Sequence, residues 1–236
     1  MGNRVDHGHP SADRRSAIST QPVTTSALDE LDRQVETLLD LGYPALAGRS
    51  AEAFTAALAP LRELAAGLGE LAPVAAGRAP LVLVVTRELV DPHDTVPLLR
   101  LAPRGSRPGV VDRNHGEEGL APYRPIAEVT LPRPDAYLLL DVDRGQEFRG
   151  VRPEEALPVV LGRGAHAPDR RGGGRRRHPR AEAAREEPLL HLSGSRRGDR
   201  RVPAMWISER APKLGWCWDG NPHTWLGVAS VGARIG

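Results

Sequence analysis

The chain of 236 residues contains a single cysteine, Cys217, and a single lysine, Lys213. One cysteine excludes a disulfide within the chain and a zinc site built from cysteines, and it suits a reducing compartment. No apolar run approaches the roughly 18 residues of a membrane span, and the start MGNRVDHGHP lacks the hydrophobic stretch of a signal peptide. We therefore expect a cytoplasmic protein without a membrane partner.

The common signatures of several enzyme classes are also missing. There is no GxxxxGK[ST], no GxGxxG after a strand, no HExxH, no GxSxG and no internal repeat. These absences exclude the enzyme classes that are easiest to recognise. They leave the cofactor, the oligomeric state and the presence of any catalytic activity undetermined.

Basic residues are concentrated in one segment. The whole chain has a net charge of +2, but residues 165–191 hold seven arginines against four acidic residues, a local net charge of +3. The rest of the chain therefore carries a net charge of −1. Since that remainder is not basic, we expect no nucleic-acid partner unless the segment itself binds one in a salt-dependent manner.

Two amphipathic helices are predicted after a polar extension, residues 1–24, which we expect to be disordered. Between Ser26 and a stop at 42–44, apolar residues recur at helical spacing, namely Leu28, Leu31, Val35, Leu38 and Leu39. A second helix is predicted to begin at Ser50 and to be kinked or divided by Pro60. The residues that it should bury are Phe54, Leu58, Leu61 and Leu64.

Strand patterns dominate the rest of the chain. Residues 81–85 are five consecutive aliphatic residues, too few for a buried helix and rich in β-branched side chains. Further strands are predicted at 96–101, 109–112 and 136–141, a helix at 153–160, and a β-meander at 202–208, 213–218 and 224–230. This order predicts an α+β fold: N-terminal helices packed on a mixed, largely antiparallel sheet that ends in a Trp-rich β-meander. Residues 25–236 are predicted to form one domain.

The densest polar cluster lies in GVVDRNHGEEG, directly after a predicted strand. Its members are Asp112, Arg113, Asn114, His115 and Glu117. At a strand end they can form a ligand site in which His115 acts as acid, base or ligand and Arg113 binds an anion. The alternative is a turn whose Asn, His and Gly residues accept unusual backbone angles while charged neighbours face water.

A second polar motif, LLLDVDRGQEF, ends a strand with Asp141 and Asp143. Residues two apart on a strand point to the same side, so this acid pair is a candidate for holding Mg²⁺ or sharing a proton. The alternative is a strand end at which the carboxylates are solvated or cap a turn. Because Mg²⁺ needs further oxygen ligands that the pattern does not supply, we assign no metal site.

All four tryptophans fall within the last 31 residues, three of them in APKLGWCWDGNPHTWLG. Alternation places Trp216 and Trp218 on one strand face and Cys217 on the other. The candidates for a ligand-stacking pocket are Trp216, Trp218, Asn221, His223 and Trp225. Cys217 with His223 is a candidate thiol nucleophile and base. The alternative is a Trp-rich sheet core with a turn at 219–222 and an inert cysteine.

Several segments carry a family resemblance: LDRQVETLLDLGYPALAG, VVDRNHGE, YLLLDVDRGQEFRGVRPEEALPV, GDRRVPAMWIS and APKLGWCWDGNPHTWLGVAS. In them the sequence resembles an uncharacterised actinobacterial family, the domain of unknown function 5701. The resemblance runs from about residue 28 to 164 and again from 192 to the end. It implies an actinobacterial, cytoplasmic protein of unassigned role, and it carries over no catalytic residue.

Residues 165–191 do not resemble the family and have the composition of a GC-rich gene read out of frame. Arginine supplies 31 of the 32 basic residues, which indicates GC-rich codons. One base later, permissible codons read RTPLTVEEGVAVVTHAPRPLARNRCFT, in which a capping box precedes an apolar helical run. We hypothesise a frameshift near Gly164, compensated near Leu192, that leaves 165–188 irregular, whereas 188–195 can still pair as a strand. A stop codon in the shifted frame of the gene would exclude it.

Three functions follow from these motifs. The first is binding of a small polar ligand where the VVDRNHGE and Trp-rich motifs converge. The second is a hydrolase or group-transfer enzyme that uses His115 or the pair Asp141 and Asp143, which must then lie close together. The third is a non-catalytic protein-interaction module, which an exposed leucine stripe on the first helix would favour. The motifs favour ligand binding.

Overall fold

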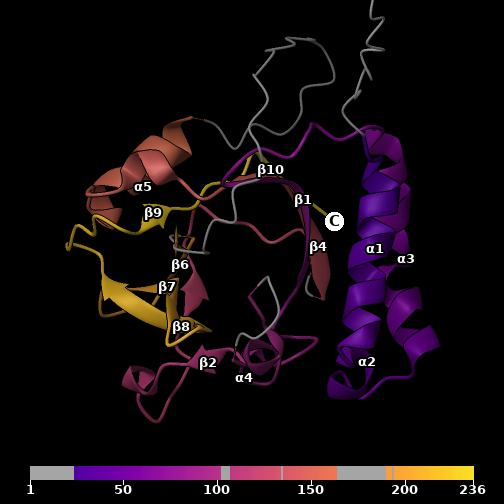
Figure 1. Ribbon diagram of the computed structural model, residues 1–236, viewed down its shortest axis with the longest axis horizontal. Coiled ribbons are helices and arrows are strands. Elements are labelled where there is room, and N and C mark those ends of the chain that lie inside the picture. Colours follow the sequence, from indigo (N-terminus) through magenta and orange to yellow (C-terminus); the bar gives the residue numbers. More distant parts are fainter. Residues whose placement is uncertain (1–23, 102–106, 134, 164–189, 193) are drawn as a thin grey trace, which may run out of the picture.

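Two sheets organise the protein in the computed structural model, which describes residues 24–101, 107–133, 135–163, 190–192 and 194–236. A three-stranded sheet is covered by the N-terminal helices, and a five-stranded sheet lies on the other side of the molecule (Figure 1). A third sheet pairs only β3 (Arg124–Pro125) with β6 (Ser195–Arg196). Helices combined with mostly antiparallel sheets confirm the α+β prediction.

The N-terminal helices begin where their capping residues predict. In α1 (Ala27–Asp40) the Ser26 hydroxyl accepts a hydrogen bond from the Asp29 N–H, and in α3 (Ala51–Leu68) Ser50 accepts one from Ala53. Between them Gly42, with φ of +81°, starts the short helix α2 (Tyr43–Leu46). Helices α1 and α3 lie side by side (Figure 1).

Helix α3 corrects two expectations. It continues past Pro60 as one helix of 18 residues, so Pro60 does not divide it. Pro60 has no N–H to donate to the carbonyl of Ala56, and Ala56 is an exposed residue. Leu64 is partly exposed and Ala65 is buried in its place, because the face of the helix that contacts the sheet follows the positions of Phe54, Leu58 and Leu61.

The first sheet has the order β1–β4–β10, with both neighbouring pairs antiparallel. It is formed by β1 (Arg78–Val85), β4 (Ala136–Asp143) and β10 (Ala233–Ile235). Its core against the helices contains thirteen buried residues: Ala27, Leu31, Val35, Tyr43, Phe54, Leu58, Leu61, Ala65, Leu81, Leu89, Val90, Ala136 and Leu138. The predicted strand at 81–85 is thus part of an interior strand.

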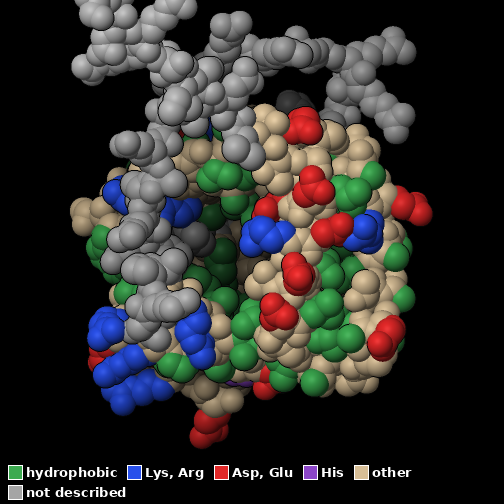
Figure 2. Space-filling model, turned by 45° about the vertical axis from the view of Figure 1, so that its right-hand side comes forward, with side chains coloured by type: hydrophobic (Ala, Val, Ile, Leu, Met, Phe, Trp, Pro, Cys, Tyr) green, Lys and Arg blue, Asp and Glu red, His purple; other side chains and the backbone are tan. Residues whose placement is uncertain are grey.

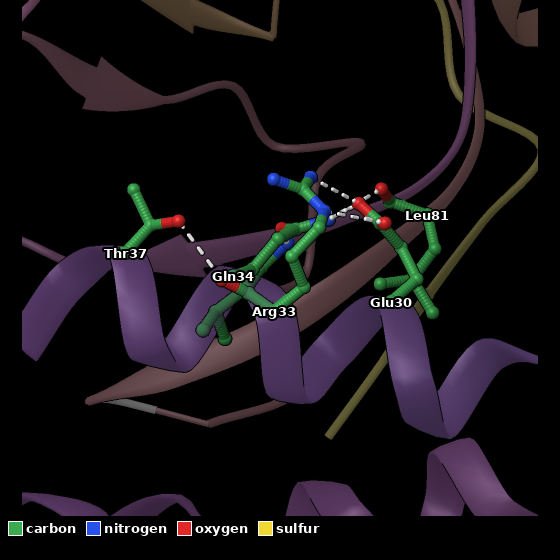
Figure 3. A network of polar contacts seen from close by, with 6 residues as sticks. Glu30, Arg33, Gln34, Thr37 and Leu81 are labelled. Atoms are coloured by element: carbon green, nitrogen blue, oxygen red, sulfur yellow. Dashed lines mark hydrogen bonds and ion pairs between the residues drawn. The ribbon is translucent and has the colours of Figure 1, made fainter.

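Gln34 of α1 closes the outer edge of β1. Its side-chain amide donates to the carbonyl of Leu81 at 3.0 Å (Figure 3). It also accepts a hydrogen bond from the N–H of Leu83 at 2.7 Å. A neighbouring strand would use the same pair of backbone groups. Glu30 orients the amide by accepting a second hydrogen bond from it, and Arg33 holds Glu30 (Figure 3). The helix therefore docks on the sheet by a polar contact as well as by its apolar face.

We expect Gln34→Leu to lower the free energy of unfolding by about 2 kcal/mol, because it leaves two partly buried backbone groups without partners. Urea unfolding checks this value. Glu36→Leu on the exposed side of the same helix is the control and should change stability by less than about 0.5 kcal/mol. Equal effects of the two substitutions would contradict the edge-closing role of Gln34.

The second sheet has the order β2–β8–β7–β5–β9. Its strands are β2 (Val110–Val111), β5 (Leu190–His191), β7 (Arg201–Ser208), β8 (Ala211–Trp218) and β9 (Gly227–Val228). β7 and β8 form the predicted hairpin, and β2 runs parallel to β8. The third meander strand is not formed as predicted: within 224–230 only β9 is a strand, and it pairs with β5. The strand expected at 188–195 is confirmed only as the short β5.

The strand predicted at 96–101 is wrong. Residues 92–98 form α4 (Pro92–Thr95) and the 3₁₀ turn η1 (Val96–Leu98). Asp91 caps α4 by accepting from the His93 N–H, and Pro97 has no N–H for a strand ladder. The remaining elements are η2 (Arg113–His115), η3 (Gln146–Phe148) and α5 (Pro153–Gly162).

A C-terminal seam, residues 227–232, joins the two sheets. The backbones of Ser230 and Asp143 exchange two hydrogen bonds of 2.9 Å, and the Val228 N–H donates to the carbonyl of Gly145. From there the chain continues into β10 beside β4, so one segment pairs with β5 at its start and with β4 at its end (Figure 1).

Charged side chains are distributed unevenly over the surface. On the helical side visible in Figure 2 most charged side chains are acidic, whereas Lys and Arg side chains gather at the lower left. No helix in the described part of the chain is long and apolar enough to cross a membrane. The predicted extension, apart from Thr24, and the predicted irregular segment 165–188 lie outside the described residues.

Candidate functional site

Asp112 lies at the point where β2 ends beside β8. Its N–H donates to the carbonyl of Leu214 at 2.8 Å, and its side chain accepts from the N–H of Asn114 at 2.9 Å, which starts η2. The side chain is only 6% exposed. The motif is therefore a turn at a strand end, but unlike the turn suggested by the sequence it holds one carboxylate inside the protein.

Lys213 neutralises this carboxylate. Its Nζ lies 2.8 Å from Oδ2 of Asp112. Burial by itself would raise the pKa of the Asp112 carboxyl, but the hydrogen bonds from Lys213 and from the backbone of Asn114 outweigh burial, and the pKa is lowered. Asp112 is consequently ionised at neutral pH.

A pocket of about 270 Å³ opens beside this ion pair, along the edge of β8. Within the described residues β2 pairs only with Lys213 and Leu214 of β8. Beyond them Trp216 and Cys217, which point to opposite faces of β8, both line the pocket. The lining residues, which we call the Trp–Asp pocket, are Asp112, Asn114, Trp206, Trp216, Cys217 and Trp225. The Trp216 indole N–H donates to the carbonyl of Asn114 at 2.9 Å and so ties the two motifs together.

Trp206 is a pocket residue that sequence reasoning missed. The outer edge of its ring lies against Gly215 on the next strand, where an added Cβ atom would overlap it. It meets Trp225 edge to face, with ring centroids 6.2 Å apart and an angle of 82° between the planes. Trp206 lies opposite Lys213 in the pairing of β7 with β8, and therefore on the same sheet face as Cys217. The sequence alone does not contain this register.

The other two tryptophans share the opposite face, as predicted. Trp216 and Trp218 have ring centroids 5.0 Å apart, and the Arg201 guanidinium lies 4.5 Å from the first and 5.7 Å from the second. Trp218 and Asn221 line a separate, more open hollow together with Arg152, Glu154, Arg200, Asp219 and Gly220. The structure thus places Trp216 and Trp225 in one concave site and Trp218 and Asn221 in another, whereas His223 lines neither.

His115 is buried beneath the turn rather than exposed in the pocket. It is 2% exposed, its Nε2–H donates to the carbonyl of Leu214 at 3.2 Å, and its ring meets Tyr123 edge to face. Its Nδ1 has no hydrogen-bond partner among the described residues. Arg113 and Glu117 are exposed and do not line the pocket. In this position His115 supports the Asp112 turn.

We expect the free energy of unfolding to fall as pH decreases below about 6.5, the ordinary value for an unfolded histidine. Burial lowers the pKa of His115, and also that of His223, so the folded state favours neutral rings. The stabilisation is complete above the unfolded pKa and is lost as pH falls towards the folded one. Urea unfolding between pH 5 and 8 measures the slope. His115→Gln should flatten it, and an unchanged slope would contradict the role of burial.

The acid pair lies elsewhere, in the first sheet. Asp143 pairs with Arg78 at 2.7 Å and accepts from the N–H of Gly145 at 2.8 Å, so that it caps a turn. Asp141 is exposed and has a positive φ of 50°. This angle departs from the extended conformation that would place Asp141 and Asp143 on the same side of the strand. Within the described part of the chain no three His, Cys, Asp or Glu side chains group to hold a metal ion. No hydrogen bond or ion pair found there connects this pair to His115.

Two further predictions can be placed on the structure. Burial raises the pKa of the Cys217 thiol to about 11, so a thiolate nucleophile is not formed at neutral pH, and the ring of His223 contacts Trp225.

On α1, Leu31 and Val35 are buried against the sheet. The exposed leucine stripe that would favour an interaction module is therefore not present at these positions.

Comparison with known proteins gives one family. Residues 37–236 match the family described as "Family of unknown function (DUF5701)". No curated protein and no solved structure matches the chain. The family resemblance expected from the sequence is confirmed, and it assigns no activity.

Proposed function

We propose that this chain, a protein that belongs to the DUF5701 family, binds a small polar ligand in the Trp–Asp pocket. One observation carries the proposal: a buried, ionised carboxylate and three tryptophans from separate segments line a single concavity. Ligand sites combine apolar and aromatic walls with a few placed polar groups in this way. The convergence of the VVDRNHGE and Trp-rich motifs supports ligand binding over the other functions considered.

The dimensions of the pocket limit the ligand. Its 270 Å³ correspond to about nine water molecules at roughly 30 Å³ each. This volume is slightly below the range of about 300–1,000 Å³ that is usual for ligand sites. We therefore propose a ligand of about ten non-hydrogen atoms rather than a nucleotide or a coenzyme.

A fluorescence titration with a library of small polar metabolites tests the proposal. Because three of the four tryptophans line the pocket, a bound ligand should change the intrinsic emission and raise the unfolding midpoint. Trp225→Leu should weaken binding at least tenfold, whereas Trp218→Leu, in the separate hollow, should leave it unchanged. A library without any ligand that responds to Trp225→Leu would overturn the proposal.

We further propose four properties of the protein: a cytoplasmic location, an actinobacterial origin, the lack of a nucleic-acid partner and a frameshift within 165–191. The reducing compartment inferred from one cysteine supports the first, and the net charge outside the Arg-rich segment supports the third. The gene's nucleotide sequence tests the fourth directly.

A further inference from the structure

The tryptophan faces of this site already attract cations within the protein. Arg201 lies over Trp216 and Trp218, and Nζ of Lys213 lies 5.9 Å from the ring centroid of Trp206. The negative face of an indole ring makes such contacts favourable. Among the described residues Trp225 is the tryptophan that has no cation of this kind, and 42% of it is exposed. Trp225 is thus a partly exposed tryptophan on the pocket wall that is not paired with a cation among the described residues.

The arrangement of the walls favours a rounded group over a flat one. Trp206 and Trp225 stand nearly perpendicular, at 82°, and a flat ring cannot stack on two perpendicular faces at once. A tetrahedral ammonium group, in contrast, can contact both. Rings around a cation form the aromatic cages that recognise quaternary ammonium groups.

The polar end of the pocket holds the carboxylate of Asp112, which is already paired with Lys213 but keeps unused acceptor positions. Asp112 uses Oδ2 for Lys213 and Oδ1 for the N–H of Asn114, whereas a carboxylate offers about four acceptor positions. Lys213 shows that an ammonium is accepted between this carboxylate and Trp206. The remaining lining side chains supply few acceptors: the exposed amide of Asn114 and the buried thiol of Cys217.

We propose that the ligand group in the Trp–Asp pocket is a methylated ammonium, held by the faces of Trp206 and Trp225 and by the charge of Asp112. This assignment rests on the proposed function. Each methyl group on an ammonium replaces one N–H donor that would need an acceptor. A methylated ammonium therefore suits a site with three indole rings and one carboxylate better than a primary ammonium does. Lys213 shares the carboxylate and therefore limits the affinity.

The test uses the full chain and three probes: choline, 3,3-dimethylbutan-1-ol and ethanolamine. The first two have the same shape and differ in charge, and the third keeps the charge without the methyl groups. Isothermal titration calorimetry should give an affinity for choline at least tenfold higher than for either of the other two. Equal affinity for choline and the uncharged alcohol, or tighter binding of ethanolamine, would overturn the assignment.

Variants of the ion pair give effects of opposite sign. Asp112→Asn should weaken choline binding about tenfold, because it removes the anionic charge. Lys213→Met should strengthen it several-fold, because the ligand then has the carboxylate to itself. Choline should accordingly raise the unfolding midpoint of the Lys213→Met protein more than that of the unaltered protein. Weaker binding in both variants would mean that the pair only shapes the pocket, and would contradict the assignment.

These experiments separate the two proposals. If metabolites bind the pocket in the fluorescence assay but choline shows no preference over its uncharged analogue, the ligand class is wrong and ligand binding stands. If choline and every library compound leave the protein unchanged, both proposals fail. Trp218→Leu is the matched control and should leave the affinity for choline as it is, since Trp218 lies in the separate hollow.

Discussion

Gly145→Ala is expected to lower the free energy of unfolding by more than about 4 kcal/mol, enough to prevent the protein from accumulating in its folded form. A Cβ atom at this position would overlap the carbonyl of Val228. The φ of Gly145 is also +67°, in the left-handed region that side chains disfavour by about 1–2 kcal/mol. Urea unfolding, or the yield of soluble protein, measures the effect.

The expected loss is large because the C-terminal seam cannot move away. Residue 228 lies in β9, which pairs with β5, and Ser230 is bonded to Asp143 through two backbone hydrogen bonds. A shift of the Val228 carbonyl would therefore disturb both sheets. Gly227, whose added Cβ would overlap the carbonyls of Arg144 and Gly145, makes the approach equally close from the other side.

Gly150→Ala is a matched control for this substitution. Gly150 has a φ of +79°, but an added Cβ would have no atom within 4 Å. It should cost only the backbone strain of about 1–2 kcal/mol. Similar losses for the two variants would show that the seam adapts and that contact with Val228 adds little.

The helices could be predicted because their signals are local. Ser26 and Ser50 are capping residues that act on N–H groups three positions along, and the apolar spacing of Leu31 and Val35 describes one helix face. The error at Leu64 has a global cause. Which residue of a helix end is buried depends on where the sheet ends, and the helix sequence does not contain that information.

Strand pairing was less accessible for the same reason. The β7–β8 hairpin follows from a short turn, and it was predicted. β9 pairs with β5 because residues 219–226 carry the chain from the end of β8 to the far edge of the sheet. At 96–101 the aliphatic pattern predicts a strand, but two residues in the sequence argue against it. Asp91 is a helix-capping residue, and Pro97 has no N–H to pair in a strand.

The candidate site was predicted in part. Asp112, Asn114, Trp216 and Trp225 were recognised as candidates, and the structure brings them together. Lys213 and Trp206 were missed, because their relevance comes from the register of β7 with β8. His115, a candidate acid, base or ligand, is buried and does not line the pocket, and a sequence pattern cannot distinguish such a buried histidine from an exposed one.

Lys213→Met is expected to lower the free energy of unfolding by about 3 kcal/mol, because it leaves the buried carboxylate of Asp112 without its counter-charge. Asp112→Asn should cost less, about 1 kcal/mol, since the Lys213 side chain is 28% exposed and its ammonium can turn to water. The Asn side chain can still accept the hydrogen bond from residue 114.

The double variant Asp112→Asn with Lys213→Met decides whether the two residues act as a pair. With no charge left to compensate, it should be more stable than Lys213→Met alone by about 1–2 kcal/mol. Against single losses of about 3 and 1 kcal/mol this is a coupling of about 2–3 kcal/mol, which a double-mutant cycle in urea measures. Additive losses would mean that Lys213 stabilises the fold through its contact with Trp206 instead. Coupling between the two residues would support the claim that Asp112 keeps its charge inside the pocket, the property on which recognition of a cation depends.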